Sequence, residues 1–139
     1  VEIKGTFRTF DEKWRAEAHE KMVFMAQSIA ESMGARCKFE VRKGYPFLVN
    51  HDETTRFSKE AAIAYLGREN VVDLELRMTA EDFAFYSQKV PSCFYRLGTS
   101  NFSKGITGNL HSSTFNVDES SLEVGMGLMS YIALEQLKS

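Results

Sequence analysis

Hydrophobic residues recur along the chain with two spacings, and each spacing predicts a different kind of element. Residues 1–10 and 36–43 alternate between apolar and polar positions, which is typical of half-buried β-strands. Between them, Asp11 is a good helix N-cap, and apolar residues at spacings of three or four then form one stripe as far as Met33. Residues 1–45 are therefore predicted to form a β-α-β unit, with the helix on one face of a sheet.

The pattern breaks at Gly44-Tyr45-Pro46, where we place a domain boundary. After it, helical and strand patterns alternate in the order α-β-α-β-α. The expected elements are a helix over 52–66, a strand over 71–77, a short helix opened by a capping box at 79–82, a strand over 93–98, and a helix opened by a second capping box of Ser120 and Glu123. The sequence thus predicts an α/β fold, with one domain over 1–45 and a second over 46–139.

Composition and charge exclude some classes of protein. The chain has 139 residues, 43% of them hydrophobic, and a net charge of −2, so no basic field favours nucleic acid. No apolar run approaches the ~20 residues that span a membrane, and the N-terminus lacks the pattern of a signal peptide. The two cysteines are far apart and outside any metal-binding motif, which suits a cytoplasmic location. The chain starts at Val1 in a strand pattern, so we expect it to be part of a longer protein.

One histidine stands where functional side chains often lie. His111 follows a loop rich in Ser, Gly and Asn, and it precedes the last predicted helix. A neutral imidazole is the commonest metal ligand and a usual general base near neutral pH. From spacing alone, a hydrogen-bonded structural histidine is the simpler interpretation. Asp118 and Glu119 could ligate a metal, but acidic residues at this place also stabilise a helix N-terminus.

Three other residues carry side chains suited to binding or catalysis. Glu81 and Asp82 form an acidic pair that could supply a metal ligand or an acid–base pair, although acidic residues are routine in the first turn of a helix. Arg8 has a planar guanidinium suited to a carboxylate, although a solvated surface arginine is the simpler interpretation. None of the usual catalytic motifs occurs, so these residues alone identify no function.

Five segments, taken in order, resemble a known family. The segments are GTFRTF at 5–10, RKGYP at 42–46, AEDFAFY at 80–86, FYRLG at 94–98, and LHSSTF at 110–115 followed by Asp118-Glu119. They resemble the C-terminal part of the metal-dependent aminoacylase/carboxypeptidase family. The most similar branch is that of the amidohydrolases, which includes hippurate hydrolases, N-acyl-amino-acid amidohydrolases and auxin-conjugate hydrolases.

The resemblance implies an architecture. Family members join a catalytic domain that holds two metal ions to an inserted lid, a four-stranded antiparallel sheet with two helices on one face. Residues 1–45 would then be the second half of the lid, and residues 46–139 the C-terminal segment of the catalytic domain. Because such lids commonly dimerise, we expect a homodimer that pairs through the lid, with 1–9 or 36–43 as the unpaired edge.

The resemblance also implies roles for individual residues. His111 matches the last metal ligand of the family, and Arg8 matches the lid arginine that binds the free carboxylate of the substrate. Glu81 and Asp82 lie in a turn that matches a loop near the active site. Thr79 departs from the glycine that this branch often has, which puts the shape of that loop in doubt.

The implied function is hydrolysis of the amide bond in N-acyl amino acids or related peptide-like conjugates, with two divalent metal ions, zinc or manganese, as cofactors. The other metal ligands and the general base are absent from this sequence. The 139 residues alone are therefore predicted to be inactive and to bind no metal ion tightly. The alternative is a non-catalytic dimerisation or small-molecule-binding module with a lid-like fold.

Overall fold

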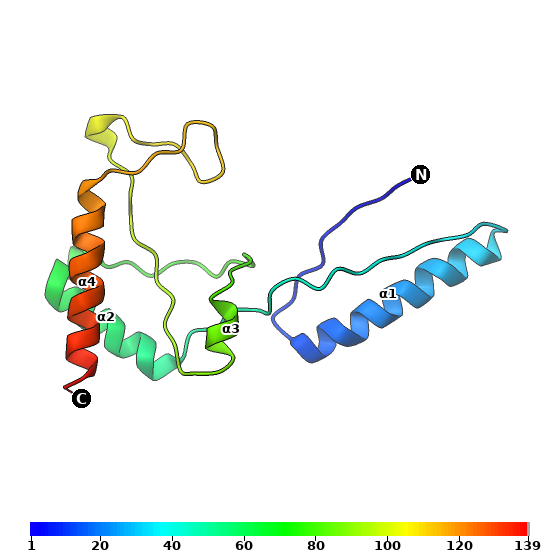
Figure 1. Ribbon diagram of the computed structural model, residues 1–139, viewed down its shortest axis with the longest axis horizontal. Helices are drawn as coiled ribbons and strands as arrows, with labels where there is room; N and C mark the ends of the chain where they lie inside the picture. The colour runs from blue at the N-terminus through cyan, green and yellow to red at the C-terminus, as the bar shows by residue number, and fades with distance from the viewer. Residues whose placement is uncertain (139) are drawn as a thin grey trace. The chain divides into compact units, whose positions relative to one another are not determined.

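The computed structural model describes residues 1–138, and its regular elements are helices. In chain order they are α1 (Glu12–Ser32), α2 (Asp52–Leu66), α3 (Ala84–Ser87) and α4 (Ser120–Gln136), with two short 3₁₀-helices at Arg68–Asn70 and Phe102–Lys104 (Figure 1). Ser139, the last residue of the predicted second domain, lies outside the described residues. None of the helices in the described part of the chain is both long enough and apolar enough to span a membrane.

Helices α1 and α2 confirm the sequence prediction because local signals fix their ends. The Asp11 carboxylate accepts a hydrogen bond from the Trp14 backbone N–H at 2.9 Å and so caps α1. Beyond the last turn, Gly34 takes a φ of 72°, a left-handed conformation that glycine adopts without strain. In α2 the cap is His51, whose side chain accepts from the Thr54 N–H. This histidine therefore has a structural role that its sequence context did not indicate.

The prediction of an α/β fold is wrong. The structure is 46% helical and 1% strand, and no sheet forms among residues 1–138. The 1–10, 36–43, 71–77 and 93–98 segments run as irregular chain (Figure 1). Alternating apolar residues define one face of an extended segment, but a strand also requires a partner with which to exchange backbone hydrogen bonds. The one β-bridge within the described residues is an isolated antiparallel contact between Asn101 and Ile106.

The two predicted capping boxes are also wrong. The short helix α3 begins at Ala84 rather than near 79, and its first turn lacks a side-chain cap. At the start of α4, the N-cap is Glu119, again without a side-chain hydrogen bond. Instead, the Asp118 carbonyl accepts from the Ser121 N–H at 2.9 Å, and its carboxylate accepts from the Ser120 N–H at 3.4 Å. The stabilising group thus comes from the residue before the expected box.

The chain divides into two compact units. The first comprises residues 1–49 and 75–91, and the second comprises residues 50–74 and the chain from 92 to the end of the described residues. In the first unit, the start of α1 is bound to the segment after it. The buried Arg15 donates to the Tyr45 carbonyl at 2.8 Å, and Glu12 accepts from the Phe47 N–H at 3.2 Å. The predicted boundary after residue 45 stays a prediction.

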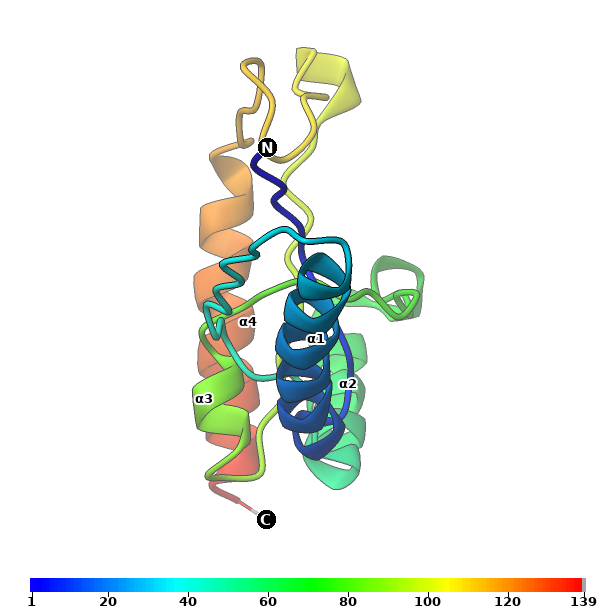
Figure 2. The same cartoon turned by 90° about the vertical axis from the view of Figure 1, so that its right-hand side faces the viewer.

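In the second unit, α2 and α4 pack side by side (Figures 1 and 2). The Tyr65 and Tyr131 rings lie 5.4 Å apart between them. Gly127 faces the Tyr65 hydroxyl so closely that a β-carbon would overlap it, and a β-carbon on Gly125 would lie 2.7 Å from the Leu97 side chain. The two glycines of α4 therefore allow the close approach of Tyr65 and Leu97.

Large apolar side chains remain accessible. Among the described residues, Leu128 of α4 is the one large buried hydrophobic residue, and alanines supply the rest of the buried apolar positions. The stripe predicted along α1 is buried at Ala18, but Met25 and Met33 are 57% and 80% exposed. Much of the apolar stripe of α1 therefore stays accessible in the described chain.

Candidate functional site

His111 lies in a loop that leads into α4. We call residues 99–118 the His111 loop. It contains the 3₁₀-helix Phe102–Lys104 and ends just before α4. Figures 1 and 2 draw it in yellow and orange beyond the N-terminal end of α4. The imidazole is exposed, so it is accessible to a ligand from outside the loop.

The backbone of His111 adopts a left-handed conformation. Its φ is 63°, and among the described residues it is the one non-glycine residue with a positive φ. Such a conformation costs on the order of 1–3 kcal/mol for a residue with a β-carbon, so neighbouring interactions have to maintain it. They come from Ser112, whose N–H and hydroxyl both donate to the Asn109 carbonyl, at 3.2 and 2.7 Å. These bonds form a tight turn around His111.

A close backbone contact closes the turn behind His111. A β-carbon built on Gly108 would overlap the carbonyl of Thr114 and would lie 2.9 Å from the Phe115 nitrogen. The two arms of the loop therefore touch at this point, and only glycine fits there. The contact confines His111 to a small inner turn, residues 108–114.

Asp118 holds the base of the loop. Its carboxylate is buried and accepts from the Asn101 amide at 2.5 Å and from the Lys104 ammonium at 2.7 Å. Its own backbone N–H donates to the Thr99 carbonyl at 2.9 Å. The hydrogen bond from Asn101 above all, and then those from Lys104 and Ser120, hold the pKa of the Asp118 carboxyl well below its usual range. The residue is therefore a charged anchor between the two arms of the loop.

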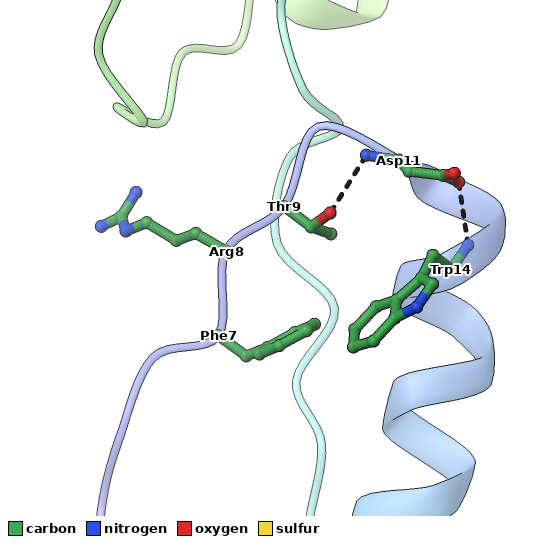
Figure 3. Close-up of a pocket in the computed structure, with 5 residues that line it drawn as sticks. All are labelled: Phe7, Arg8, Thr9, Asp11 and Trp14. Carbon is green, nitrogen blue, oxygen red and sulfur yellow. Dashed lines mark hydrogen bonds between the residues drawn. The ribbon is translucent and has the colours of Figure 1, made fainter.

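Arg8 lies in the first unit, beside an open hollow that Figure 3 shows. Phe7 and Trp14 stack at one side of this hollow with ring centroids 5.4 Å apart, and the Arg8 side chain points away from them. Its Nη1 donates to the Met78 carbonyl at 3.0 Å. Arg8 is thereby bound to the segment that leads into the turn carrying Glu81.

Glu81 and Asp82 precede α3 in the same unit as Arg8. The Glu81 carboxylate accepts from the Asp82 backbone N–H at 3.0 Å, a local bond that orders the turn. Asp82 is exposed and Glu81 is half-buried. The structure thus places three of the four predicted site residues in one unit and His111 in the other.

A metal site requires several ligands, and the described residues supply one candidate. His111 fits as a single ligand because its imidazole is exposed on an ordered turn. Within residues 1–138, however, no group of three or more His, Cys, Asp or Glu side chains gathers to hold an ion. We therefore derive no chemical step through a metal from the described residues.

Sequence reasoning missed two residues of this site. Asn101 and Lys104 bind the Asp118 carboxylate from 17 and 14 residues away. The sequence shows only a polar loop with a glycine at this position, and nothing in it links these side chains to Asp118. The expected role of Asp118 at the N-terminus of α4 is real, but most of its hydrogen bonds go to the His111 loop.

Comparisons with known proteins agree with the resemblance in the motifs. Residues 3–135 match the model of peptidase family M20/M25/M40. The chain is 35% identical to thermostable carboxypeptidase 2 of Saccharolobus solfataricus, over 97% of this chain and 34% of that protein. It is 34% identical to N-acetylcysteine deacetylase of Bacillus subtilis, over 99% and 35%, and 33% identical to IAA-amino acid hydrolase ILR1-like 6 of Arabidopsis thaliana, over 96% and 30%. No solved structure matches significantly.

These matches show the class of protein: the chain is part of a hydrolase. It belongs to peptidase family M20/M25/M40, whose enzymes generally depend on divalent metal ions. The family predicted from the five sequence segments is therefore confirmed. The chain spans about a third of the length of the curated relatives that it matches.

Proposed function

We propose that the chain works as part of a metal-dependent amidohydrolase and that it contributes one metal ligand, His111. The observation that carries the proposal is the combination of family membership with an exposed imidazole on a tightly closed turn. Two divalent ions, zinc or manganese, would complete their coordination with ligands from outside this chain. When bound, such ions polarise a carbonyl group and activate water.

The proposed substrate is an N-acyl amino acid or a related peptide-like conjugate. Three relatives are named as a carboxypeptidase, an N-acetylcysteine deacetylase and an IAA-amino acid hydrolase. All three names are compatible with an amide bond next to an amino acid. The scissile bond would lie near a free carboxylate in such a substrate, which makes a fixed cation useful for orientation.

Arg8 is the proposed partner of that carboxylate. Its guanidinium has five N–H donors, and the Met78 carbonyl accepts from Nη1. This bond directs the side chain, while the planar fork suits bidentate binding of a carboxylate. Glu81 and Asp82 would lie in the loop that borders the same site.

The proposed architecture follows the family resemblance. Residues 1–45 would belong to a lid that pairs with a second copy, and residues 46–139 would belong to the catalytic domain. With one ligand for two ions, the 139-residue chain alone would be inactive and would bind metal weakly. The protein would work in the cytoplasm as a homodimer.

The substrate proposal is tested with the longer protein in which we propose that the chain works. Hydrolysis of a panel of N-acyl amino acids is compared with hydrolysis of the same compounds carrying a carboxamide in place of the carboxylate. We expect the carboxylates to be preferred, and the preference to fall about 10–100-fold in Arg8→Ala, as for loss of a charged hydrogen bond. Arg77→Ala is the control. Equal rates on both sets would contradict the role of Arg8, and no hydrolysis of either would contradict the substrate class.

A further inference from the structure

The anchor at the base of the His111 loop combines burial with charge. Asp118 is 6% exposed, and it is the one buried carboxylate among residues 1–138. Charged groups are rarely buried unless they are paired and hydrogen-bonded, and Asp118 is both. A capping residue for α4 would require only its bonds to the first turn of that helix. The additional bonds to Asn101 and Lys104 go to the opposite arm of the loop.

These bonds define how far the loop can open. Asn101 is itself fixed, because it forms the bridge to Ile106 and its side-chain oxygen accepts from the Ser103 hydroxyl at 2.7 Å and from the Lys104 N–H at 3.3 Å. The incoming arm is therefore a folded turn, and Asp118 joins that turn to the outgoing arm. Because a loop whose ends are held together has far fewer conformations than an open one, order at the base limits the movement of the inner turn.

The inner turn depends on the same closure. Gly108 and Thr114 lie on opposite arms, and their backbones are in close contact. His111 lies beyond this contact in its left-handed conformation. If the base opens, only the local bonds of the inner turn, such as those from Ser112 to the Asn109 carbonyl, are left to maintain the left-handed conformation of His111.

We infer that Asp118 is a positioning residue for His111, which it holds in place by joining Asn101 and Lys104 to the outgoing arm of the loop. This inference rests on the proposed function only in the part that concerns metal affinity. Residues that orient a metal ligand change affinity without touching the ion, since a ligand that must first be ordered binds more weakly. Asp118 would orient His111 in this way from the base of the loop, without touching the metal ion.

The test compares Asp118→Asn with wild type in the longer protein, first without metal. Amide hydrogen exchange over residues 105–117 should become about tenfold faster or more, while exchange over α2 should not change. An amide in place of the carboxylate loses the charge that binds Lys104 and presents an NH₂ group to the NH₂ group of Asn101. Asp73→Asn is the matched control, because Asp73 also pairs with a lysine, Lys59 at 2.6 Å, but is exposed and lies outside the loop.

The second readout is metal affinity, measured by titration with zinc. Asp118→Asn should weaken affinity about 10–100-fold, the range for groups that orient a ligand. Combining Asn101→Asp with Asp118→Asn returns one carboxylate and one amide to the pair and should restore most of the affinity and of the exchange protection. Lys104→Gln, which changes an exposed side chain, should show the same pattern at smaller amplitude, and it replaces Asp118→Asn if that variant fails to fold.

Several results would overturn the inference. Exchange over 105–117 that resembles that of Asp73→Asn would show that Asp118 does not close the loop. Faster exchange without loss of zinc affinity, in a protein that loses zinc on His111→Ala, would show that loop order does not position the ligand. If His111→Ala itself retains zinc, the metal part of the proposed function fails. The positioning role is then decided by hydrogen exchange and by the NMR signals of the His111 ring. Ring signals in Asp118→Asn that equal those of wild type overturn the role. Ring signals that shift in Asp118→Asn and return to the wild-type position in the double variant support it.

Discussion

The His111 loop and the 36–43 segment both lie outside the α-helices, and they differ in the interactions that hold them in place. The loop is closed at its base by Asp118 and is closed again at Gly108, so its own side chains and backbone define its path. The 36–43 segment alternates apolar and polar residues, but it enters no strand pairing in the described chain. Hydrogen bonds and ion pairs within the loop define its conformation locally. Alternation of apolar and polar residues defines only which face of an extended segment is apolar, and the segment still requires a neighbouring strand to pair with.

Ion pairs sharpen this contrast. Lys38 and Glu40 form a pair at 2.5 Å along the extended segment, but their side chains are 86% and 57% exposed. Solvent screens such a pair, so it contributes little to order. The pair between Lys104 and Asp118 has one buried member and joins two arms of chain. The Lys104–Asp118 pair is therefore expected to order its loop, because it is partly buried and joins separate parts of the chain, whereas the exposed Lys38–Glu40 pair is not.

The largest expected effect comes from opening the inner turn. In Gly108→Ala the new β-carbon meets the Thr114 backbone, which cannot rotate away as a side chain could. We expect a loss of about 1–3 kcal/mol in the free energy of unfolding, as for overpacking. Gly98→Ala is the control, because no atom lies within 4 Å of its β-carbon position. Equal stabilities of the two variants in urea would mean that the arms of the loop do not touch.

The His111 loop should lose stability in acid and keep it at neutral pH. The pKa of Asp118 is held below its ordinary value by Asn101 and Lys104, so the stability it contributes is present above the unfolded pKa of about 3.9 and is lost as the pH falls toward the folded pKa. Urea unfolding should therefore show a steeper loss below about pH 4 in wild type than in Asp118→Asn. Because Lys59 also lowers the pKa of Asp73, the same series in Asp73→Asn separates the two carboxylates. Parallel curves for wild type and Asp118→Asn would contradict a charged anchor.

The smallest expected effect concerns the extended segment. Glu40→Pro removes a backbone N–H and restricts the preceding residue to extended conformations, which this segment already suits. In the 139-residue chain, we expect the free energy of unfolding to change by less than about 0.5 kcal/mol, as for a surface substitution. A loss of several kcal/mol would show that residue 40 donates to a strand, and the contrast with the His111 loop would then fail.

Much of the helical structure could be predicted because its signals are local. Asp11, Gly34 and Gly67 mark the ends of α1 and α2, and each acts within a few residues of its own position. The predicted sheet failed because pairing depends on residues far along the chain or outside it. The capping box at 79–82 failed because α3 begins only at Ala84, beyond Asp82, the residue that would have completed the box.

The sequence points to His111 as a candidate but does not show the loop that surrounds it. His111 stands in a motif that the family resemblance makes conspicuous, so its position could be read from the sequence. The left-handed backbone of His111, the contact between Gly108 and Thr114, and the bonds of Asp118 are properties of a folded loop. Neither spacing nor residue type indicates that Asn101 would meet Asp118.

The most direct test of the central claim is the metal content of His111→Ala in the longer protein, with His19→Ala as control. Both proteins are dialysed against the same zinc concentration, and the bound zinc is measured per chain. We predict that His111→Ala retains clearly less zinc than wild type, whereas His19→Ala, whose ring contacts Phe7, retains all of it. Full zinc occupancy in His111→Ala would contradict the assignment of His111 as a metal ligand.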